Sequence, residues 1–194
     1  MKISKSVMII SFICFLVVFV PSANATTFGH IHSQGGKFGA YYDSSIASYG
    51  YTSHFDFARN AWAGISPNVA ISKSNTKGYG IDEYYVGTSS TPHLYGLFTP
   101  YNNVFGAGVP VDPSNSNWVY SVISVYDNNL NTDGYKNSTN IRHTTTHEVG
   151  HSLGLAHTED ASKKAASVMT AGSEANRSIN TPSDYDKNQL RTLY

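Results

Sequence analysis

The sequence predicts an α+β fold in which helices pack on a mixed β-sheet, and two observations support this prediction. In the first half of the chain, short segments with the apolar pattern of strands surround one segment with apolar residues at helical spacing. A second helical segment follows the last of these strands and contains closely spaced histidines. The order strand, helix, strand, strand suits a mixed sheet with a helix packed on it.

The first segment, residues 1–25, has the pattern of a signal peptide. Lys2 and Lys5 precede an apolar run from Val7 to Val20, and Ala23-Asn24-Ala25 offers small residues at a cleavage site. The run is short for a membrane span, so an uncleaved anchor is the less favoured alternative. We expect a secreted, extracellular protein that begins near Thr26 and is not held in the membrane after cleavage.

The remaining segment, residues 26–194, contains 169 residues, which suits one domain. The single cysteine, Cys14, lies in the signal, so we expect no disulfide in the mature protein. Without Lys2 and Lys5, the segment carries 11 basic and 13 acidic residues, a net charge of −2. This balance excludes a strongly basic surface for nucleic acid or anionic lipid. We expect a monomer.

The mature chain is expected to begin with a loose arm and then a strand. Residues 26–36 are polar and contain glycine, so His30 and His32 are expected to be solvated, with metal binding as the less favoured alternative. Alternating apolar residues from Lys37 to Tyr42 predict the first strand.

One helix and several strands are expected next. A helix from Ser53 to Gly64 is indicated by apolar residues at helical spacing, which would form a buried stripe of Phe57, Ala58, Ala61 and Trp62. The patterns of β-branched and aromatic residues then predict four strands, at Val69–Ile71, Glu83–Val86, Leu94–Thr99 and Trp118–Tyr126. We expect 94–99 to be an edge strand and 118–126 to be central, because the latter has the strongest strand pattern.

A polar segment separates the last strand from the second long helix. Residues 127–134 are rich in oxygen ligands, but Thr132 stands where an EF-hand loop would require glycine. A plain turn is therefore favoured, and Ca²⁺ is kept as an additional candidate. The helix is expected to start near Asn140.

This helix carries the residues on which the functional prediction depends. His147 and His151 are four residues apart and lie on one helical face, so both rings can bind one metal ion. Glu148 is placed to reach a water at that metal and act as general base. Gly154 allows the chain to turn away, and His157 can then return as the third ligand. Three imidazoles with one open position are the ligand set of a catalytic zinc site.

A further histidine leaves the choice of ligand pair open at first. His143 lies four residues before His147, so these two could also bind a metal from one face. Only the pair His147 and His151 has Glu148, Gly154 and the third histidine in register. We therefore interpret His143 as a residue that supports the ligands from behind or lies at the surface.

The stretch from His147 to His157, HEVGHSLGLAH, matches the metzincin pattern HExxHxxGxxH and resembles the matrixins, the matrix metalloproteinase branch of that clan. The resemblance implies a metzincin-like fold: a twisted five-stranded mixed sheet, two long helices, a zinc cleft, and a small irregular C-terminal subdomain with a methionine turn and a closing helix. Met169 would be the methionine of that turn, a hydrophobic floor below the zinc. The segment from Pro182 to Tyr194 would be the closing helix.

The resemblance also has limits. The tyrosine and proline that usually follow the methionine in matrixins are replaced by Thr170, Ala171, Gly172 and Ser173, so cleavage preference does not transfer. The histidine pattern of a second, structural zinc is missing, and we do not expect that ion. Calcium sites of the family occur near the turn at 127–134, and the strand at 94–99 would bind an extended peptide substrate at its edge.

The predicted function is that of a secreted zinc metalloendopeptidase acting on proteins or peptides. Zn²⁺ held by His147, His151 and His157 would activate water, with Glu148 as general base and Gly154 and Met169 as structural support. The alternative is a secreted binding or toxin-like module that keeps zinc only to stabilise its fold. Zinc content without cleavage of any peptide would favour that alternative.

Overall fold

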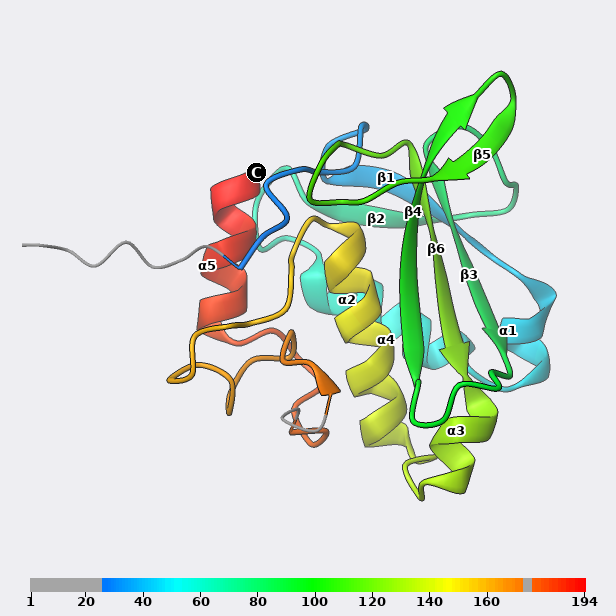
Figure 1. The fold of residues 1–194 in the computed structure, drawn as a ribbon, viewed down its shortest axis with the longest axis vertical. Coiled ribbons are helices and arrows are strands. Elements are labelled where there is room, and N and C mark those ends of the chain that lie inside the picture. Colours follow the sequence, from blue (N-terminus) through cyan, green and yellow to red (C-terminus); the bar gives the residue numbers. More distant parts are fainter. Residues whose placement is uncertain (1–25, 173–175) are drawn as a thin grey trace, which may run out of the picture.

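The computed structural model describes residues 26–172 and 176–194; the predicted signal peptide lies outside them. An α+β arrangement of strands and helices makes up this part of the chain (Figure 1). The elements are β1 (Lys37–Tyr42), α1 (Ser44–Ser48), α2 (Thr52–Trp62), β2 (Ala70–Ser74), β3 (Ile81–Gly87), β4 (Gly96–Val104), β5 (Ala107–Pro110), β6 (Tyr120–Tyr126), α3 (Asp127–Thr132), α4 (Ser138–Ser152) and α5 (Asp184–Leu193). The predicted fold class is confirmed. Within the described residues, no helix has the length and apolar character that crossing a membrane requires.

The sheet is mixed, with strand order β2-β1-β3-β6-β4-β5. The first four strands of this order are parallel to one another, whereas β4 is antiparallel to β6 and to β5. The connection from β1 to the parallel strand β2 requires a crossover, which α2 provides. As predicted, β6 is central, because it pairs with β3 on one side and β4 on the other.

The described sheet has six strands, not the five that were expected, because β4 continues through a tight hairpin into β5. The two turn residues, Phe105 and Gly106, have φ of 52° and 87°. Two central residues with positive φ form a turn whose twist matches that of a hairpin. These two positions lack the Asn-Gly or Asp-Gly pair that usually indicates this turn, so the hairpin was not predicted.

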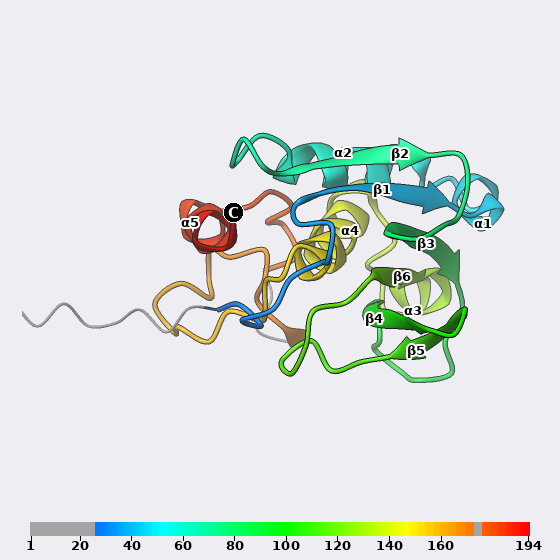
Figure 2. The same cartoon turned by 90° about the horizontal axis from the view of Figure 1, so that it is seen from above.

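The core lies between the sheet and the two long helices, α2 and α4, as Figure 2 shows from above. Buried and partly buried residues alternate along β3 and β6, so one face of each strand enters the core. On α2 the buried stripe includes Phe55 instead of the predicted Phe57, which is partly exposed like Ala61. The indole nitrogen of Trp62 donates to the Thr146 carbonyl at 2.9 Å and joins α2 to α4.

The N-terminal arm is not loose, which corrects the prediction for residues 26–36. Thr27 pairs with Leu155 in an antiparallel bridge and His32 pairs with Trp118 in a parallel one. The His32 ring is fully buried, stacks on Phe38 at 4.2 Å and is not solvated. The sequence pattern missed this because the partners of the arm lie far along the chain.

The C-terminal segment ends in the predicted closing helix, α5. Ser183 and Asp186 form a capping box at its start, in which each side chain binds the backbone of the other residue. Asp186 also accepts a hydrogen bond from the Val168 backbone at 3.1 Å and one from the Ser167 hydroxyl. The start of α5 therefore anchors the segment that contains Met169.

Candidate metal centre

The helix α4 places most of the candidate residues. Asn137 caps its N-terminus by accepting a hydrogen bond from the Asn140 backbone at 3.0 Å, so the helix begins two residues before the predicted position. The helix ends after Ser152, and the backbone of Gly154 has φ of 93°. A Cβ on Gly154 would lie 2.9 Å from Leu193 and 3.0 Å from the His30 carbonyl. The position therefore requires glycine for both its conformation and its space.

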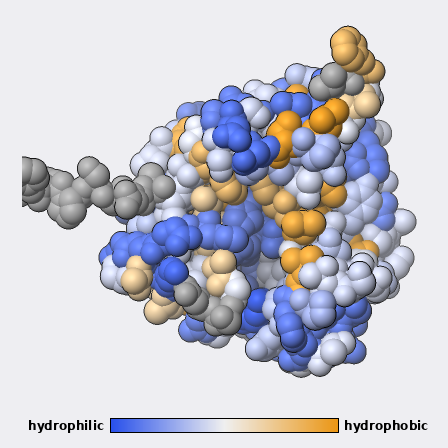
Figure 3. All heavy atoms as spheres, viewed as in Figure 1, coloured by the Kyte–Doolittle hydropathy of each residue, from blue (hydrophilic) through white to orange (hydrophobic). Residues whose placement is uncertain are grey.

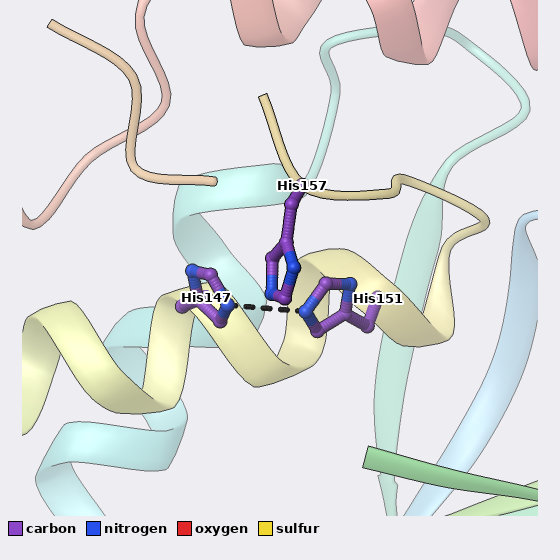
Figure 4. A group of neighbouring side chains, drawn as sticks. All are labelled: His147, His151 and His157. Atoms are coloured by element: carbon purple, nitrogen blue, oxygen red, sulfur yellow. Dashed lines mark hydrogen bonds between the residues drawn. The ribbon is translucent and has the colours of Figure 1, made fainter. Parts of the chain in front are cut away.

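Three histidines converge at this end of α4 (Figure 4). His147 and His151 come from the helix, and His157 reaches them from the segment after the turn. One ring nitrogen of each histidine lies within 4.8 Å of those of the other two. These three residues are the only group of at least three histidine, cysteine or carboxylate side chains found close enough for a metal within the described residues.

The backbone orients two of these rings. Nδ1 of His147 lies 2.8 Å from the Val168 carbonyl, and Nδ1 of His151 lies 2.7 Å from the Leu155 carbonyl. A carbonyl only accepts hydrogen bonds, so each Nδ1 carries the proton and each Nε2 keeps a free electron pair. These two electron pairs face each other across 3.0 Å. Two nitrogens that share a tetrahedral zinc ion lie about 3.3 Å apart, so this arrangement fits zinc.

The protonation state of the group also fits a metal. Burial lowers the pKa of His151 to about 3 and that of His147 well below its usual value. The side chain of His157 is more exposed, and partial desolvation of its ring lowers its pKa as well. The rings are therefore neutral at pH 7, which is the form that binds metal. With three nitrogen donors and no fourth protein ligand in the group, the donor set matches an open zinc site.

Glu148 lies beside the histidines and is buried. Burial raises the pKa of its carboxyl group to about 8, and this effect is partly offset by a hydrogen bond with the Phe98 backbone and by the charge of Arg177. The side chain fits because residue 96 on β4 is glycine: a Cβ there would lie 2.5 Å from Oε1 of Glu148. Gly96 is thus part of the site, although its sequence position gave no sign of it.

Met169 packs below α4 and is buried. A Cβ on Gly150 would lie 2.4 Å from the methionine sulfur and 2.8 Å from Trp62, so Gly150 makes room for this packing. The Met169 carbonyl accepts a hydrogen bond from the Thr158 backbone at 3.0 Å. This contact connects the methionine segment to the residue that follows His157.

His143 is buried one turn before His147 and is not part of the three-histidine group. Its ring stacks on that of His147 with 6.2 Å between centroids. Its Nδ1 contacts the Ile179 carbonyl at 2.5 Å, and burial lowers its pKa to about 4. Of the two roles considered for His143, the surface position is therefore excluded.

The candidate site lies in a cleft of about 1030 Å³ between β4 and the segment that follows Met169. Figure 3 shows this face of the molecule hollowed at its centre. The cleft is lined by the three histidines and Glu148, by residues 94–98 before and within β4, and by Thr170, Ala171, Gly172, Asn176, Arg177 and Ser178 on the opposite wall. Arg177 was not identified from the sequence, because a single arginine in an irregular segment carries no motif.

Of the comparisons with known proteins, the comparison with family models agrees with this geometry. The family model of the matrixins matches residues 32–194. No curated protein matched the sequence. Among solved structures, the chain is similar to high choriolytic enzyme 1, a hatching enzyme zinc-protease from the medaka fish Oryzias latipes. The two share 13% identity with a TM-score of 0.44, over 89% of this chain and 96% of that chain. So distant a structure does not bear on function.

Proposed function

Because this chain belongs to the matrixin family, we propose that it is a secreted zinc-dependent endopeptidase, with residues 1–25 as the signal peptide and residues 26–194 as the catalytic domain. The observation that supports this proposal best is the convergence of His147, His151 and His157 beside Glu148 in an open cleft. Three neutral imidazoles with a buried carboxylate nearby are the parts that metal-assisted hydrolysis requires.

The neighbouring strand edge suits an extended peptide substrate. Through Gly96–Tyr101, β4 pairs with β6 on one side. On its other side, β5 pairs only with Tyr101–Val104, so no described strand covers the outer edge of residues 96–99. These residues border the cleft, and Leu97 is 42% exposed. A peptide added to this edge would satisfy the unpaired backbone groups and pass the histidines.

In the proposed reaction, the chain's own residues hold the metal and move the proton. When bound by the three Nε2 or equivalent ring nitrogens, zinc would supply a Lewis acid that polarises the scissile carbonyl and makes a water molecule more acidic. Glu148 accepts a proton from the attacking water on a carboxylate oxygen and returns it to the leaving amine nitrogen. Burial alone raises the pKa of Glu148, and the charge of a bound zinc ion would favour the ionised carboxylate that can accept this proton.

The backbone contacts of the histidines have a role in this proposal. The Val168 and Leu155 carbonyls fix the orientation of the His147 and His151 rings and raise their basicity as ligands. Met169 supports the same region from below, and Gly154 allows His157 to return to the site. Calcium binding stays an untested prediction. The segment considered for it, residues 127–134, forms the helix α3 and a short turn after it, and not the plain turn that was expected.

The decisive experiment compares the wild-type protein with Glu148→Gln. We expect the purified mature protein to contain one zinc ion per chain and to cleave casein or a peptide library, and we expect a chelator to stop the cleavage. Glu148→Gln should keep the zinc and the unfolding temperature, whereas kcat should fall by about three orders of magnitude or more. Glu83→Gln makes the same chemical change on β3, outside the residues that line the cleft, and should leave kcat unaltered.

Two results would refute the proposal. Stoichiometric zinc without cleavage of any member of a broad library would favour the zinc-stabilised binding module. Loss of zinc in Glu148→Gln would show that this residue is a ligand and not the general base.

A further inference from the structure

One wall of the cleft contains a cation that the proposed reaction does not use. Arg177 lies in residues 176–183, which precede α5, is partly buried, and lines the cleft together with Glu148 and His147. It is the only arginine or lysine among the residues that line the described cleft. A positive charge so close to the candidate reaction centre is expected to influence which substrates bind.

Aromatic side chains hold the guanidinium group of Arg177 in place. Its Cζ lies 4.1 Å from the ring centroid of Tyr95 and 5.2 Å from that of Tyr135. The two rings contact each other edge to face, and the Tyr95 hydroxyl donates to Asp133 at 2.7 Å. This platform reduces the conformational freedom that the arginine would lose when it binds a ligand.

The guanidinium group is nevertheless short of hydrogen-bond acceptors. Its only direct hydrogen bond in the described part of the chain is a long one, 3.4 Å from Nη1 to the Thr144 hydroxyl. No carboxylate of the described residues lies within ion-pair distance of it; the Asp133 carboxylate is bound by Tyr95 and His93. Because no ion pair with a described carboxylate offsets it, burial lowers the pKa of Arg177. A partly buried arginine with unused donors is suited to receive a carboxylate in bidentate geometry.

The position of Arg177 indicates which part of a substrate it would contact. Thr144, which it touches, precedes Glu148 by four residues on α4, so the two lie about 6 Å apart along the helix axis. An extended peptide advances about 3.3 Å per residue. The guanidinium group is therefore within reach of a substrate residue one or two positions from the cleaved bond.

We propose that Arg177 determines specificity by binding a carboxylate of the substrate one or two residues from the cleaved bond. The carboxylate can come from an aspartate or glutamate side chain or from the end of the substrate chain. This inference rests on the proposed peptidase function and adds a substrate class to it. In this role Arg177 contacts the substrate and takes no part in proton transfer.

Three sets of fluorogenic peptides test the proposal. The first has glutamate at each position within two residues of the cleaved bond and an amidated C-terminus; the second has glutamine in its place. The third also has glutamine, but each peptide ends in a free carboxylate one or two residues after the cleaved bond. We expect kcat/KM to be about tenfold or more higher for a carboxylate peptide than for its neutral counterpart, mainly through KM. The set of carboxylate peptides that shows the higher kcat/KM identifies the source of the carboxylate.

Variants of Arg177 should change this preference in a graded way. Arg177→Gln should reduce the ratio of kcat/KM between carboxylate and neutral peptides to about one, and Arg177→Lys should keep part of this ratio. Arg177→Glu should create a preference for lysine at the same substrate position. Lys37→Glu makes a similar charge change at an exposed residue outside the cleft lining and should keep the wild-type ratio. A wild-type ratio near one, or a ratio that the Arg177 variants leave unaltered, would overturn the inference.

A binding measurement separates this inference from the peptidase proposal. Calorimetry with Glu148→Gln protein should give a lower Kd for the carboxylate peptides than for the neutral ones, and adding Arg177→Gln should abolish the difference. If this difference is found but the wild-type protein cleaves nothing, the peptidase proposal fails and the role of Arg177 in binding stands. If peptides are cleaved and Arg177 affects neither Kd nor kcat/KM ratios, only the inference on Arg177 fails.

Discussion

Gly96 shows how a residue on one element decides where a functional group on another can lie. It is the first residue of β4, and the carboxylate of Glu148 on α4 fills the space where a side chain would be. A Cβ at this position would lie 2.5 Å from Oε1, 2.7 Å from Cγ and 2.8 Å from Cδ of Glu148. Because three atoms along the side chain are involved, Glu148 could not avoid the clash by a small rotation at its end.

We therefore expect Gly96→Ala to displace Glu148 and lower kcat/KM by about 10- to 100-fold, since displacements of about 1 Å have effects of this size. Zinc content should stay at the wild-type level, because the three atoms nearest to the new methyl group all belong to Glu148 and none belongs to a histidine. Gly87→Ala on β3 is the matched control, since a Cβ there meets no atom within 4 Å. Peptide cleavage and metal analysis of the two variants provide the test. Equal activity would show that Glu148 can occupy another position without loss.

At this scale, what could be predicted depended on distance along the chain. His147, Glu148 and His151 share one helix, so their relative placement follows from helical geometry. Gly96 and Arg177 enter the site through folding, at positions far from the motif in sequence. Neither has a local pattern, and only the structure brings them into the cleft.

The turn after α4 is the element on which the third histidine depends. Gly154 has φ of 93°, and the Leu155 backbone donates to the Gly150 carbonyl at 3.2 Å to close the end of the helix. The chain then passes the N-terminal arm, where the Ala156 backbone donates to the Thr26 carbonyl at 2.9 Å. The helix end and the arm together set the path on which His157 returns.

Gly154→Ala should therefore weaken both the fold and metal binding. A left-handed conformation costs a non-glycine residue about 1 to 2 kcal/mol, and the contacts with Leu193 and the His30 carbonyl add to this. Gly134→Ala is the control: its φ is 75°, but a Cβ there meets nothing within 4 Å, so only the conformational cost should appear. Denaturant unfolding and zinc titration measure the two effects. The account of this turn is wrong if both variants lose the same stability and Gly154→Ala keeps the wild-type zinc affinity.

The elements show where sequence patterns were sufficient and where they were not. The first strand was predicted with its observed bounds, and the central strand and the closing helix were also found. The β4–β5 hairpin was missed because Phe105 occupies a left-handed turn position that glycine or asparagine usually fills. On α2 the stripe was misplaced because helical spacing alone does not distinguish Phe55 from Phe57; the side chains of α4 and the sheet decide which is buried.

At the scale of the whole molecule, the cleft forms where two parts of the fold meet. One part is the sheet with α2 and α4. The other consists of residues 158–172 together with residues 176–183 and α5, which lie on the opposite side of α4 from β4 (Figure 1). Several histidines are buried at this junction, at positions 143, 147 and 151, all with a lowered pKa. Their neutral state links the stability of the entire fold to pH.

The metal-free protein should consequently lose stability in mild acid. The pKa of His143 is about 4 in the folded protein and 6.5 as a free side chain. Its contribution is complete above pH 6.5 and is lost as the pH falls to 4, because only the unfolded chain takes up the proton in that range. This residue alone contributes about 3 kcal/mol to the free energy of unfolding above pH 6.5. Urea unfolding of chelated protein at pH 7 and pH 4.5 measures the change, and a free energy of unfolding that is the same at both pH values would contradict it.

X-ray absorption at the zinc edge tests the central claim most directly, since it reports the ligand shell of the metal in the purified protein. We expect three nitrogen ligands at about 2.0 to 2.1 Å and one further oxygen ligand, as in open histidine sites. In His157→Ala, the zinc should be lost or the nitrogen shell reduced by one. A sulfur ligand, a shell closed by four protein nitrogens, or an unaltered shell in His157→Ala would contradict the assignment of His147, His151 and His157 as the ligands.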